Sequence, residues 1–389
     1  MSCDMKGVIQ LLLLLVYSIP LFGQEKIEIV CGPYLQNVTE NEATIVWITN
    51  RNAVSWVELA PNDGSHFYAA ERPRFYDHFA GHKQIGMLHR ITLKGLDGNT
   101  RYRYRIFSQE VLENNYGYTN FGKTASSRVF KAEPYGFKTL DPATHEVAFA
   151  VVNDIHEDTG LLNDLLCQTD LEKTDFIVFN GDMVNHVESE KQILDRVLSP
   201  AVKSFASGQQ FYFVRGNHET RGIFAREYMR YFKTPSGMPY YGFRYGPAYF
   251  VVLDAGEDKP DSDIQYFGLG VWDEYREEQA QWLKRIIETE QFKTAVFKIV
   301  LMHIPPTQNM WYGAVRAKEI FVPLLNQAGV NLMISGHLHR YYYVSDADEC
   351  NFPILINGRK QIVQVWITEK SMKIIVKDTA GKVLETIKF

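Results

Sequence analysis

The feature that most constrains this chain is an apolar run that stops abruptly at a glycine and an aspartate. Residues Phe176–Phe179 have the composition of a buried strand, and Asn180-Gly181-Asp182 follows directly. A strand that ends in this way delivers a carboxylate to the carboxyl edge of a parallel sheet, where open α/β folds bind ligands. Asp182 is therefore our first candidate for a functional residue.

The same pattern occurs five times in the chain, and each apolar run ends in Asp, Asn or His. The other four runs, with the polar residues that follow them, are Val147–Val152 with Asp154 and His156, Phe211–Val214 with Asn217 and His218, Val296–Leu301 with His303, and Leu332–Ile334 with His337 and His339. Helical stretches such as Gly160–Cys167 and Glu190–Phe205 separate the first runs. Strand, polar loop and helix in alternation predict a mostly parallel sheet with crossover helices.

These loops supply seven candidate metal ligands, which are Asp154, His156, Asp182, Asn217, His303, His337 and His339. Mixed imidazole and oxygen donors suit first-row ions such as Mn, Fe or Zn better than Ca²⁺. Seven ligands are too many for one tetrahedral ion, and they suit two divalent or trivalent ions that share the carboxylate of Asp182. Two such ions can lower the pKa of a bridging hydroxide and clamp a phosphoryl group. Taken singly, each residue has a plainer role, because Asp and Asn favour turns and caps.

The five blocks together resemble the calcineurin-like metallophosphoesterase superfamily, whose pattern is DxH, GDxx, GNH[DE], a later His, and GHxH. The blocks stand here in that order, as Asp154-Ile155-His156, Gly181-Asp182, Gly216-Asn217-His218-Glu219, His303, and Gly336-His337-Leu338-His339. A single short block is weak evidence, whereas five in order are specific. The resemblance covers His145–Val344 and implies a ββ sandwich flanked by helices, so the expected catalytic domain is α/β (α+β).

The resemblance also implies a role for each residue. The first metal would take Asp154, His156, Asp182 and His339. The second metal would take Asp182, Asn217, His303 and His337. His218 would be catalytic, because the family's histidine at this position stabilises the phosphoryl oxygens or protonates the leaving group, and an imidazole suits both tasks.

The segment before this region is predicted to be all-β, with short alternating runs and a central tryptophan, Trp47. The runs and a Tyr that follows a Leu-x-x-x-Thr turn suggest a β-sandwich with a tyrosine corner. It resembles a fibronectin type III-like module, and the two-domain order is similar to that of purple acid phosphatases and their secreted bacterial relatives. Two positions depart from the purple enzymes, which have Gly at His156 and an iron-binding Tyr at Asn185. Ser/Thr protein phosphatases carry Asp-Arg at Asn185-His186, so that branch is disfavoured.

The N-terminus is predicted to be a secretory signal over residues 1–24, because Lys6 precedes the apolar run Val8–Phe22. A retained membrane anchor is the alternative. We expect export to the periplasm or beyond, a β-sandwich over residues 25–140, a catalytic domain over 141–389, and no membrane span after signal removal. The net charge of −5 argues against general nucleic-acid binding. The sequence does not indicate an oligomeric state.

The expected function is the hydrolysis of small phosphate esters, with monoesters preferred, by a hydroxide that bridges the metals. Phosphodiester hydrolysis is the nearest alternative, and the loops Glu257–Trp272 and Pro305–Ala314 would decide between the two. A secreted binding module without activity is a second alternative, and a hydrolase of non-phosphate bonds is a third.

A few other residues carry structural predictions only. Arg215 is expected in a structural ion pair, and Tyr245, Trp311 and Tyr312 are expected to pack rather than bind substrate. The helix predicted at Tyr275–Glu290 has one apolar face, and its charged residues are expected to be solvated.

Overall fold

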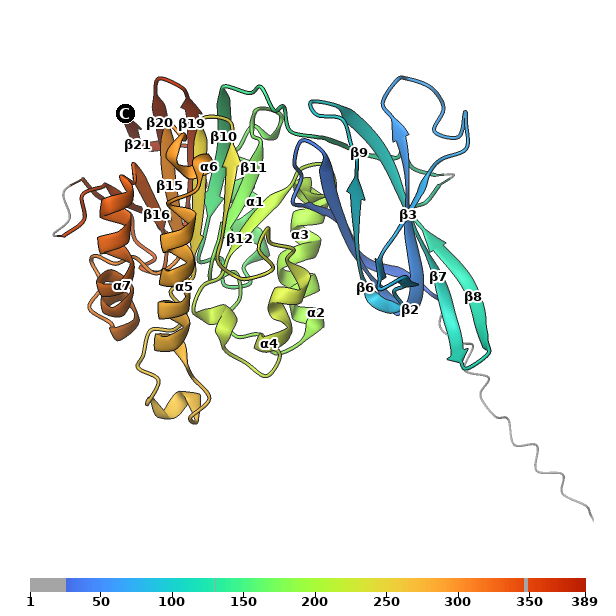
Figure 1. The fold of residues 1–389 in the computed structure, drawn as a ribbon, viewed down its shortest axis with the longest axis horizontal. Helices are drawn as coiled ribbons and strands as arrows, with labels where there is room; N and C mark the ends of the chain where they lie inside the picture. Colours follow the sequence, from blue (N-terminus) through green and yellow to red (C-terminus); the bar gives the residue numbers. More distant parts are fainter. Residues whose placement is uncertain (1–25, 130, 346–348) are drawn as a thin grey trace, which may run out of the picture.

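The computed structural model describes residues 26–129, 131–345 and 349–389 of the chain. Figure 1 shows an N-terminal β part beside a larger part in which helices flank two layers of strands. The predicted signal segment lies outside the described residues. Within them, no helix is long and apolar enough to cross a membrane.

The N-terminal part is built almost wholly from antiparallel strands. Its strands are β1 (Ile29–Gln36), β2 (Glu42–Pro61), β3 (Arg74–Tyr76), β4 (His78–Phe79), β5 (His82–Lys83), β6 (Gly86–Lys94), β7 (Arg101–Asn115), β8 (Tyr118–Ser126) and β9 (Tyr135–Lys138). The hydroxyl of Tyr102 accepts a hydrogen bond from the Asp97 nitrogen at 2.9 Å, as a tyrosine corner requires.

Strand β2 differs from the prediction, because the two runs Ala43–Thr49 and Ser55–Leu59 belong to one strand of 20 residues. Its first half pairs with β1 and β6, and its second half pairs with β3 and β7. A register shift between Ile48 and Ala53 marks the change of partner. Such an irregularity bends a strand, so one strand contributes to both layers of the sandwich. Trp47 is fully buried in this core, as expected.

The C-terminal part contains two six-stranded mixed sheets. The first has the order β12-β11-β10-β19-β20-β21 and the second has the order β13-β14-β15-β16-β18-β17. The strands are β10 (Glu146–Val152), β11 (Phe176–Asn180), β12 (Phe211–Val214), β13 (Tyr241–Tyr245), β14 (Ala248–Leu253), β15 (Phe297–Met302), β16 (Leu332–Ser335), β17 (Tyr342–Val344), β18 (Ile354–Ile356), β19 (Gln361–Thr368), β20 (Met372–Asp378) and β21 (Val383–Lys388). The expected ββ sandwich is therefore present, and β19–β21 extend the first sheet.

Helices cover the outer faces of both sheets (Figure 1). They are α1 (Thr159–Leu166), α2 (Glu190–Ile193), α3 (Ser199–Ala201), α4 (Ala225–Tyr228), α5 (Trp272–Ile286), α6 (Glu290–Lys293) and α7 (Tyr312–Ala328). Two π-helical segments, Leu194–Leu198 and Val202–Ala206, join α2 and α3 into one helical stretch. Single 3-10 turns lie at Leu171–Lys173, His218–Thr220, Met229–Tyr231 and Ile264–Tyr266.

The arrangement of the parallel strands places the functional loops together. In the first sheet β10, β11 and β12 are parallel, and in the second sheet β14, β15 and β16 are parallel. Buried side chains from both sheets, including Phe149, Phe176 and Phe250, form one shared core between the layers. Three strands of each sheet therefore end close to the same place, and their loops can meet there.

The N-terminal part packs against the helical layer of the first sheet. Tyr34 of β1 lies in the same apolar cluster as α1 and the α2–α3 stretch, and its hydroxyl donates to the Tyr231 carbonyl at 2.7 Å. Tyr104 of β7 donates to the Ser207 carbonyl at 2.6 Å. The last strand of the β part ends at Lys138 and β10 begins at Glu146. We therefore propose a domain boundary near residue 140, as expected from the sequence.

The prediction that the charged side chains of α5 are all solvated is wrong. Ala280 and Leu283 are buried as expected, but Arg276 is also completely buried. Its guanidinium donates to the carbonyls of Ala255 at 2.8 Å and Glu257 at 2.6 Å. A buried arginine is tolerated where its donors are satisfied, and here it fixes the loop that follows β14.

We predict that acid destabilises the N-terminal part through His89. This side chain is 4% exposed, and burial lowers its pKa from 6.5 to about 3. The unfolded chain therefore binds a proton below pH 6.5 that the folded chain does not, and stability falls as the pH drops from 6.5 toward 3. At pH 5 the loss relative to pH 7 is about 2 kcal/mol. His89→Met should flatten the dependence of the unfolding free energy on pH, measured in urea. His82→Gln, in the exposed β4–β5 hairpin, should keep it, and an unchanged slope in His89→Met would contradict the account.

Candidate metal centre

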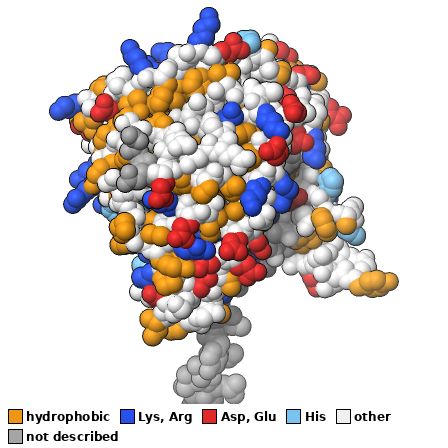
Figure 2. All heavy atoms as spheres, turned by 60° about the vertical axis from the view of Figure 1, so that its left-hand side comes forward, with side chains coloured by type: hydrophobic (Ala, Val, Ile, Leu, Met, Phe, Trp, Pro, Cys, Tyr) orange, Lys and Arg blue, Asp and Glu red, His pale blue; other side chains and the backbone are white. Residues whose placement is uncertain are grey.

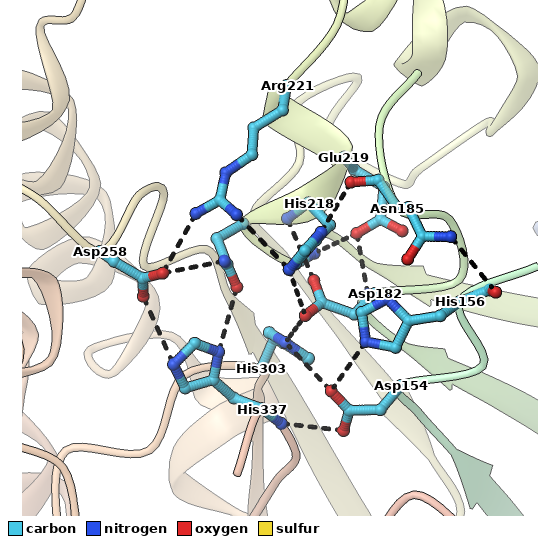
Figure 3. A network of polar contacts seen from close by, with 12 residues as sticks. Asp154, His156, Asp182, Asn185, His218, Glu219, Arg221, Asp258, His303 and His337 are labelled. Carbon is cyan, nitrogen blue, oxygen red and sulfur yellow. Dashed lines mark hydrogen bonds and ion pairs between the residues drawn. The ribbon is translucent and has the colours of Figure 1, made fainter. Parts of the chain in front are cut away.

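All seven candidate ligands meet where the loops of the two sheets converge, and Figure 3 labels five of them, Asp154, His156, Asp182, His303 and His337. Ligand atoms lie within 4.8 Å of one another in three groups, which are Asp154 with His156 and His339, His156 with Asp182 and His218, and Asp182 with His303 and His337. Asn217 joins them, because its Oδ1 lies 3.1 Å from Nδ1 of His337. Asp182 and His156 each belong to two of the groups, and Asp182 is the carboxylate that links His156 with His303 and His337.

Each of the two carboxylates has one oxygen occupied and one oxygen directed at the centre. Oδ2 of Asp154 accepts from the backbone nitrogen of His337 at 2.9 Å, and Oδ1 of Asp182 accepts from the backbone nitrogen of His218 at 3.1 Å. The remaining oxygen of Asp154 is buried without a hydrogen-bond partner. A buried anionic oxygen without a donor is costly unless a cation is nearby.

Three pairs of atoms that can each accept a proton or bind a metal ion face each other across the centre. Nε2 of His303 lies 3.0 Å from Oδ2 of Asp182, and its Nδ1 is used in a 2.6 Å hydrogen bond to the Asn180 carbonyl. The other pairs are Nε2 of His156 with Nε2 of His339 at 3.0 Å, and Nδ1 of His337 with Oδ1 of Asn217 at 3.1 Å. Each pair needs a proton or a cation between its two atoms. This donor set fits two transition-metal ions.

The pKa shifts of the side chains at the centre agree with this fit. Burial alone would raise the pKa of Asp182, but the adjacent His303 outweighs it, and the pKa lies well below the ordinary value. Burial opposes a charge on His303, yet Asp182 raises the pKa of that ring. Burial lowers the pKa of His337 to about 4, which keeps it neutral, as a ligand must be. A metal ion would take the place of the proton that His303 and Asp182 share.

The backbone at the ligands is held in an unusual conformation. Asp154, His156, Asp182, His337 and His339 all have φ between 49° and 71°. Non-glycine residues rarely adopt this left-handed region, and each one costs on the order of 1–3 kcal/mol. The turns persist because the strands and the surrounding hydrogen bonds determine them.

Two glycines of the motifs are required by close packing. A Cβ on Gly216 would lie 2.5 Å from the Asp182 nitrogen and 2.9 Å from Oε2 of Glu219. Gly181 has φ of 83°, and a Cβ there would collide with the His303 ring. Both glycines therefore let the ligand-bearing loops approach each other.

Glu219 is a residue whose role the sequence pattern did not show. It is completely buried, and its carboxylate accepts from the backbone nitrogens of Asp182 at 2.9 Å, Met183 at 2.7 Å and Gly216 at 2.8 Å. Burial, together with the charge of Asp182, raises its pKa to about 7. Glu219 thus ties the loop after β11 to the loop after β12.

His218 lies beside the candidate ligands and is partly exposed. Its Nδ1 donates to the Asn185 carbonyl at 2.6 Å, so Nε2 is the free nitrogen. Nε2 lies 3.8 Å from Oδ2 of Asp182 and 3.4 Å from Nη1 of Arg221. An imidazole held in this way can carry a proton to a group bound at the centre.

The other residues considered from sequence have clear positions. His186 is exposed, and the Asn185 amide donates to Oε1 of Glu157 at 3.1 Å. Arg215 forms the expected structural ion pair, with Asp254 at 2.7 Å. Trp311 does not pack as predicted, because it is 58% exposed with its ring centroid 5.6 Å from that of His337. It stands at the start of α7, where few neighbours can cover it.

Comparison with known families agrees with the geometry of the centre. The sequence pattern described as calcineurin-like phosphoesterase matches residues 147–341, which is half of the chain and includes every candidate ligand. The chain belongs to the calcineurin-like phosphoesterase family. The motif resemblance noted from the sequence is thereby confirmed.

The similar proteins are purple acid phosphatases. The chain is 22% identical over 319 residues to purple acid phosphatase 18 of Arabidopsis thaliana, which covers 76% of this chain and 62% of that protein. It is 24% identical over 291 residues to purple acid phosphatase 22 of the same plant, covering 68% of this chain and 56% of that protein. The chain therefore spans less than two thirds of the length of these relatives.

A solved structure shows the same fold over most of the chain. It is that of the purple acid phosphatase PPD1 from yellow lupin (Lupinus luteus) seeds, with a TM-score of 0.65 at 15% identity. The match covers 92% of this chain and 73% of that one. The predicted fold class, an N-terminal β-sandwich followed by a metallophosphoesterase core, is thus confirmed.

We predict that transition-metal ions stabilise the folded chain through Asp182. An ion that binds only the native state adds about 2.7 kcal/mol when its concentration is 100 times its Kd. Adding Mn²⁺ or Zn²⁺ to ion-free protein should raise Tm, and EDTA should reverse the rise. Asp182→Asn should lose most of the rise, while Asp164→Asn, exposed on α1, should keep it. An equal rise in Asp182→Asn would contradict a shared carboxylate.

Proposed function

We propose that this protein is a metal-dependent hydrolase of phosphate esters, with small phosphomonoesters as its preferred substrates. The observation that carries the proposal is the convergence of the free carboxylate oxygens of Asp154 and Asp182 with the ring nitrogens of four histidines. Two bound ions would supply Lewis acidity and an activated water at this place. Asp154, His156, Asp182 and His339 would hold one ion, and Asp182, Asn217, His303 and His337 would hold the other.

The chain's own residues set the geometry for the reaction. The backbone nitrogens of His337 and His218 fix the carboxylates of Asp154 and Asp182, so the ligands are in place before a substrate binds. The Asn185 carbonyl accepts from Nδ1–H of His218 and orients the ring, so that the doubly protonated imidazole can donate its Nε2 proton to the leaving-group oxygen. Trp311, beside His337, and the partly exposed Arg221, beside His218, can shape the bound ester.

We also propose that the protein works outside the cytoplasm, because the sequence favours a secretory signal and the relatives are purple acid phosphatases. The partner it requires is a small phosphate ester. On the face drawn in Figure 2, acidic and basic side chains are interspersed and form no single basic field. This supports the expectation that nucleic acids are not general ligands.

The substrate preference can be tested on purified mature protein reconstituted separately with Mn²⁺, Fe²⁺, Zn²⁺ and Mg²⁺. We expect kcat/KM for p-nitrophenyl phosphate to exceed that for bis(p-nitrophenyl) phosphate by at least about tenfold with the best ion, because a dianion gains more than a monoanion from the two positive ions. The reverse order would make the protein a phosphodiesterase. No turnover of either ester with any of the ions would favour a binding module.

The role of His218 predicts an effect that depends on the leaving group. His218→Asn should lower kcat by about 10²–10⁴-fold for a phenyl phosphate, whose leaving group needs a proton. The loss should shrink to a few-fold for 2,4-dinitrophenyl phosphate, whose leaving group does not. His186→Asn is the control, because that ring is exposed with its centroid 6.1 Å from that of His218. An equal loss for both esters would assign His218 to substrate or metal binding instead.

A further inference from the structure

A further loop reaches the centre besides the five that carry the candidate ligands. Strand β14 is one of the parallel strands of the second sheet, and the loop after it carries Asp258 into contact with two candidate ligands. The Asp258 side chain is 2% exposed, and its Oδ1 is buried without a hydrogen-bond partner. A buried carboxylate at this position calls for an explanation.

The two oxygens of Asp258 face different ligands (Figure 3). Oδ2 accepts from Nδ2 of Asn217 at 3.0 Å, and this contact defines which end of the amide carries the oxygen. Oδ1 lies 3.4 Å from Nε2 of His337, and the other ring nitrogen of His337 lies 3.1 Å from Oδ1 of Asn217. A carboxylate is the stronger acceptor, so it draws the ring proton to Nε2.

The position of Asp258 is fixed from several sides. Arg276 of α5 holds the carbonyl groups of Ala255 and Glu257, and the Gly313 nitrogen of α7 donates to the Asp258 carbonyl at 2.8 Å. Nη2 of Arg221 donates to Oδ2 of Asp258 at 3.1 Å and to Oε2 of Glu257 at 2.7 Å. Two helices and an ion-pair network therefore hold this one carboxylate in place.

We propose that Asp258 is a positioning residue for the second metal site, where it orients Asn217 and His337 together. By accepting from the amide nitrogen of Asn217 and by placing Oδ1 3.4 Å from Nε2 of His337, it turns the amide oxygen and the bare Nδ1 toward the same ion. This inference deepens the proposed metal centre and rests on it. Partners that orient metal ligands in this way typically contribute 10–100-fold in metal affinity.

For the substitution Asp258→Asn we predict the opposite position of the His337 ring proton, on Nδ1 instead of Nε2. Two donors, Nδ2 of Asn217 and Nη2 of Arg221, meet at Oδ2 of Asp258, so the new amide oxygen would take that place. Its NH₂ group would then face Nε2 of His337, which must become an acceptor. The proton would move to Nδ1, where it can donate to Oδ1 of Asn217. The same proton would block the second metal site.

The test uses the full-length mature protein in two measurements that need no substrate. Long-range ¹⁵N–¹H spectra of histidine-labelled, ion-free protein report the tautomer of His337, assigned with a His337→Gln sample. We expect Nε2–H in the native protein and Nδ1–H in Asp258→Asn. Calorimetric titration with Zn²⁺ should show two ions bound to the native protein. In Asp258→Asn the second ion should bind at least tenfold more weakly, with the first unchanged.

Glu257→Gln is the matched control, because it removes the same charge from the same network and contacts neither Asn217 nor His337. It should keep the Nε2–H tautomer and both ions. The proposal is overturned by an Nδ1–H tautomer in the native protein, by two tightly bound ions in Asp258→Asn, or by equal losses in Glu257→Gln. The native spectrum decides even if a variant does not fold. Because neither readout involves turnover, failure here is distinguishable from failure of the proposed activity.

Discussion

The centre depends on one constraint, which is that acceptor atoms held face to face in a buried site need a proton or a cation between them. Asp182 is the clearest example, because its Oδ2 lies 3.0 Å from Nε2 of His303 while the residue is only 1% exposed. In water such groups would be solvated separately, but here the fold removes the water and keeps the distance. Cations are the simplest way to satisfy the whole set. The site is therefore organised for metal ions before any ion arrives.

The fold imposes this constraint because loops from both sheets meet at the centre. Three parallel strands of each sheet end at the centre, and a common core of aromatic and branched side chains fixes the distance between the sheets. The strained turns at the ligands are tolerated because other contacts determine them, with Glu219 holding two loops of the first sheet. Stability in the core thus maintains a geometry at the site that the local sequence alone would not choose.

The convergence of the candidate ligands could be predicted because each lies two to five residues past an apolar run, and the spacing of a strand and its turn is local. The loop after β14 was expected to border the site, but the burial of Asp258 and its contacts with candidate ligands were missed for a physical reason. Asp258 stands in an acidic stretch, Glu257–Asp263, that has the composition of an exposed loop. Its burial depends on Arg221 and Arg276, which are distant in sequence. Long-range ion pairs of this kind leave no periodic signal.

The exposure of single side chains was also hard to predict. Arg276 was expected to be solvated because charged residues usually are, yet two backbone carbonyls compensate its burial. Trp311 was expected to pack because tryptophan usually does, yet it stands at a helix start with its ring open to the site. Both outcomes depend on how separate loops meet, and that is decided by tertiary structure rather than by residue type.

The most direct measurement of the central claim is anomalous X-ray diffraction from crystals of the metal-loaded protein, recorded on both sides of the Zn or Mn absorption edge. The account predicts two anomalous peaks, one on each side of the Asp182 carboxylate. One peak would lie against Asp154, His156 and His339, and the other against Asn217, His303 and His337. A single peak, or peaks that do not touch Asp182, would contradict it.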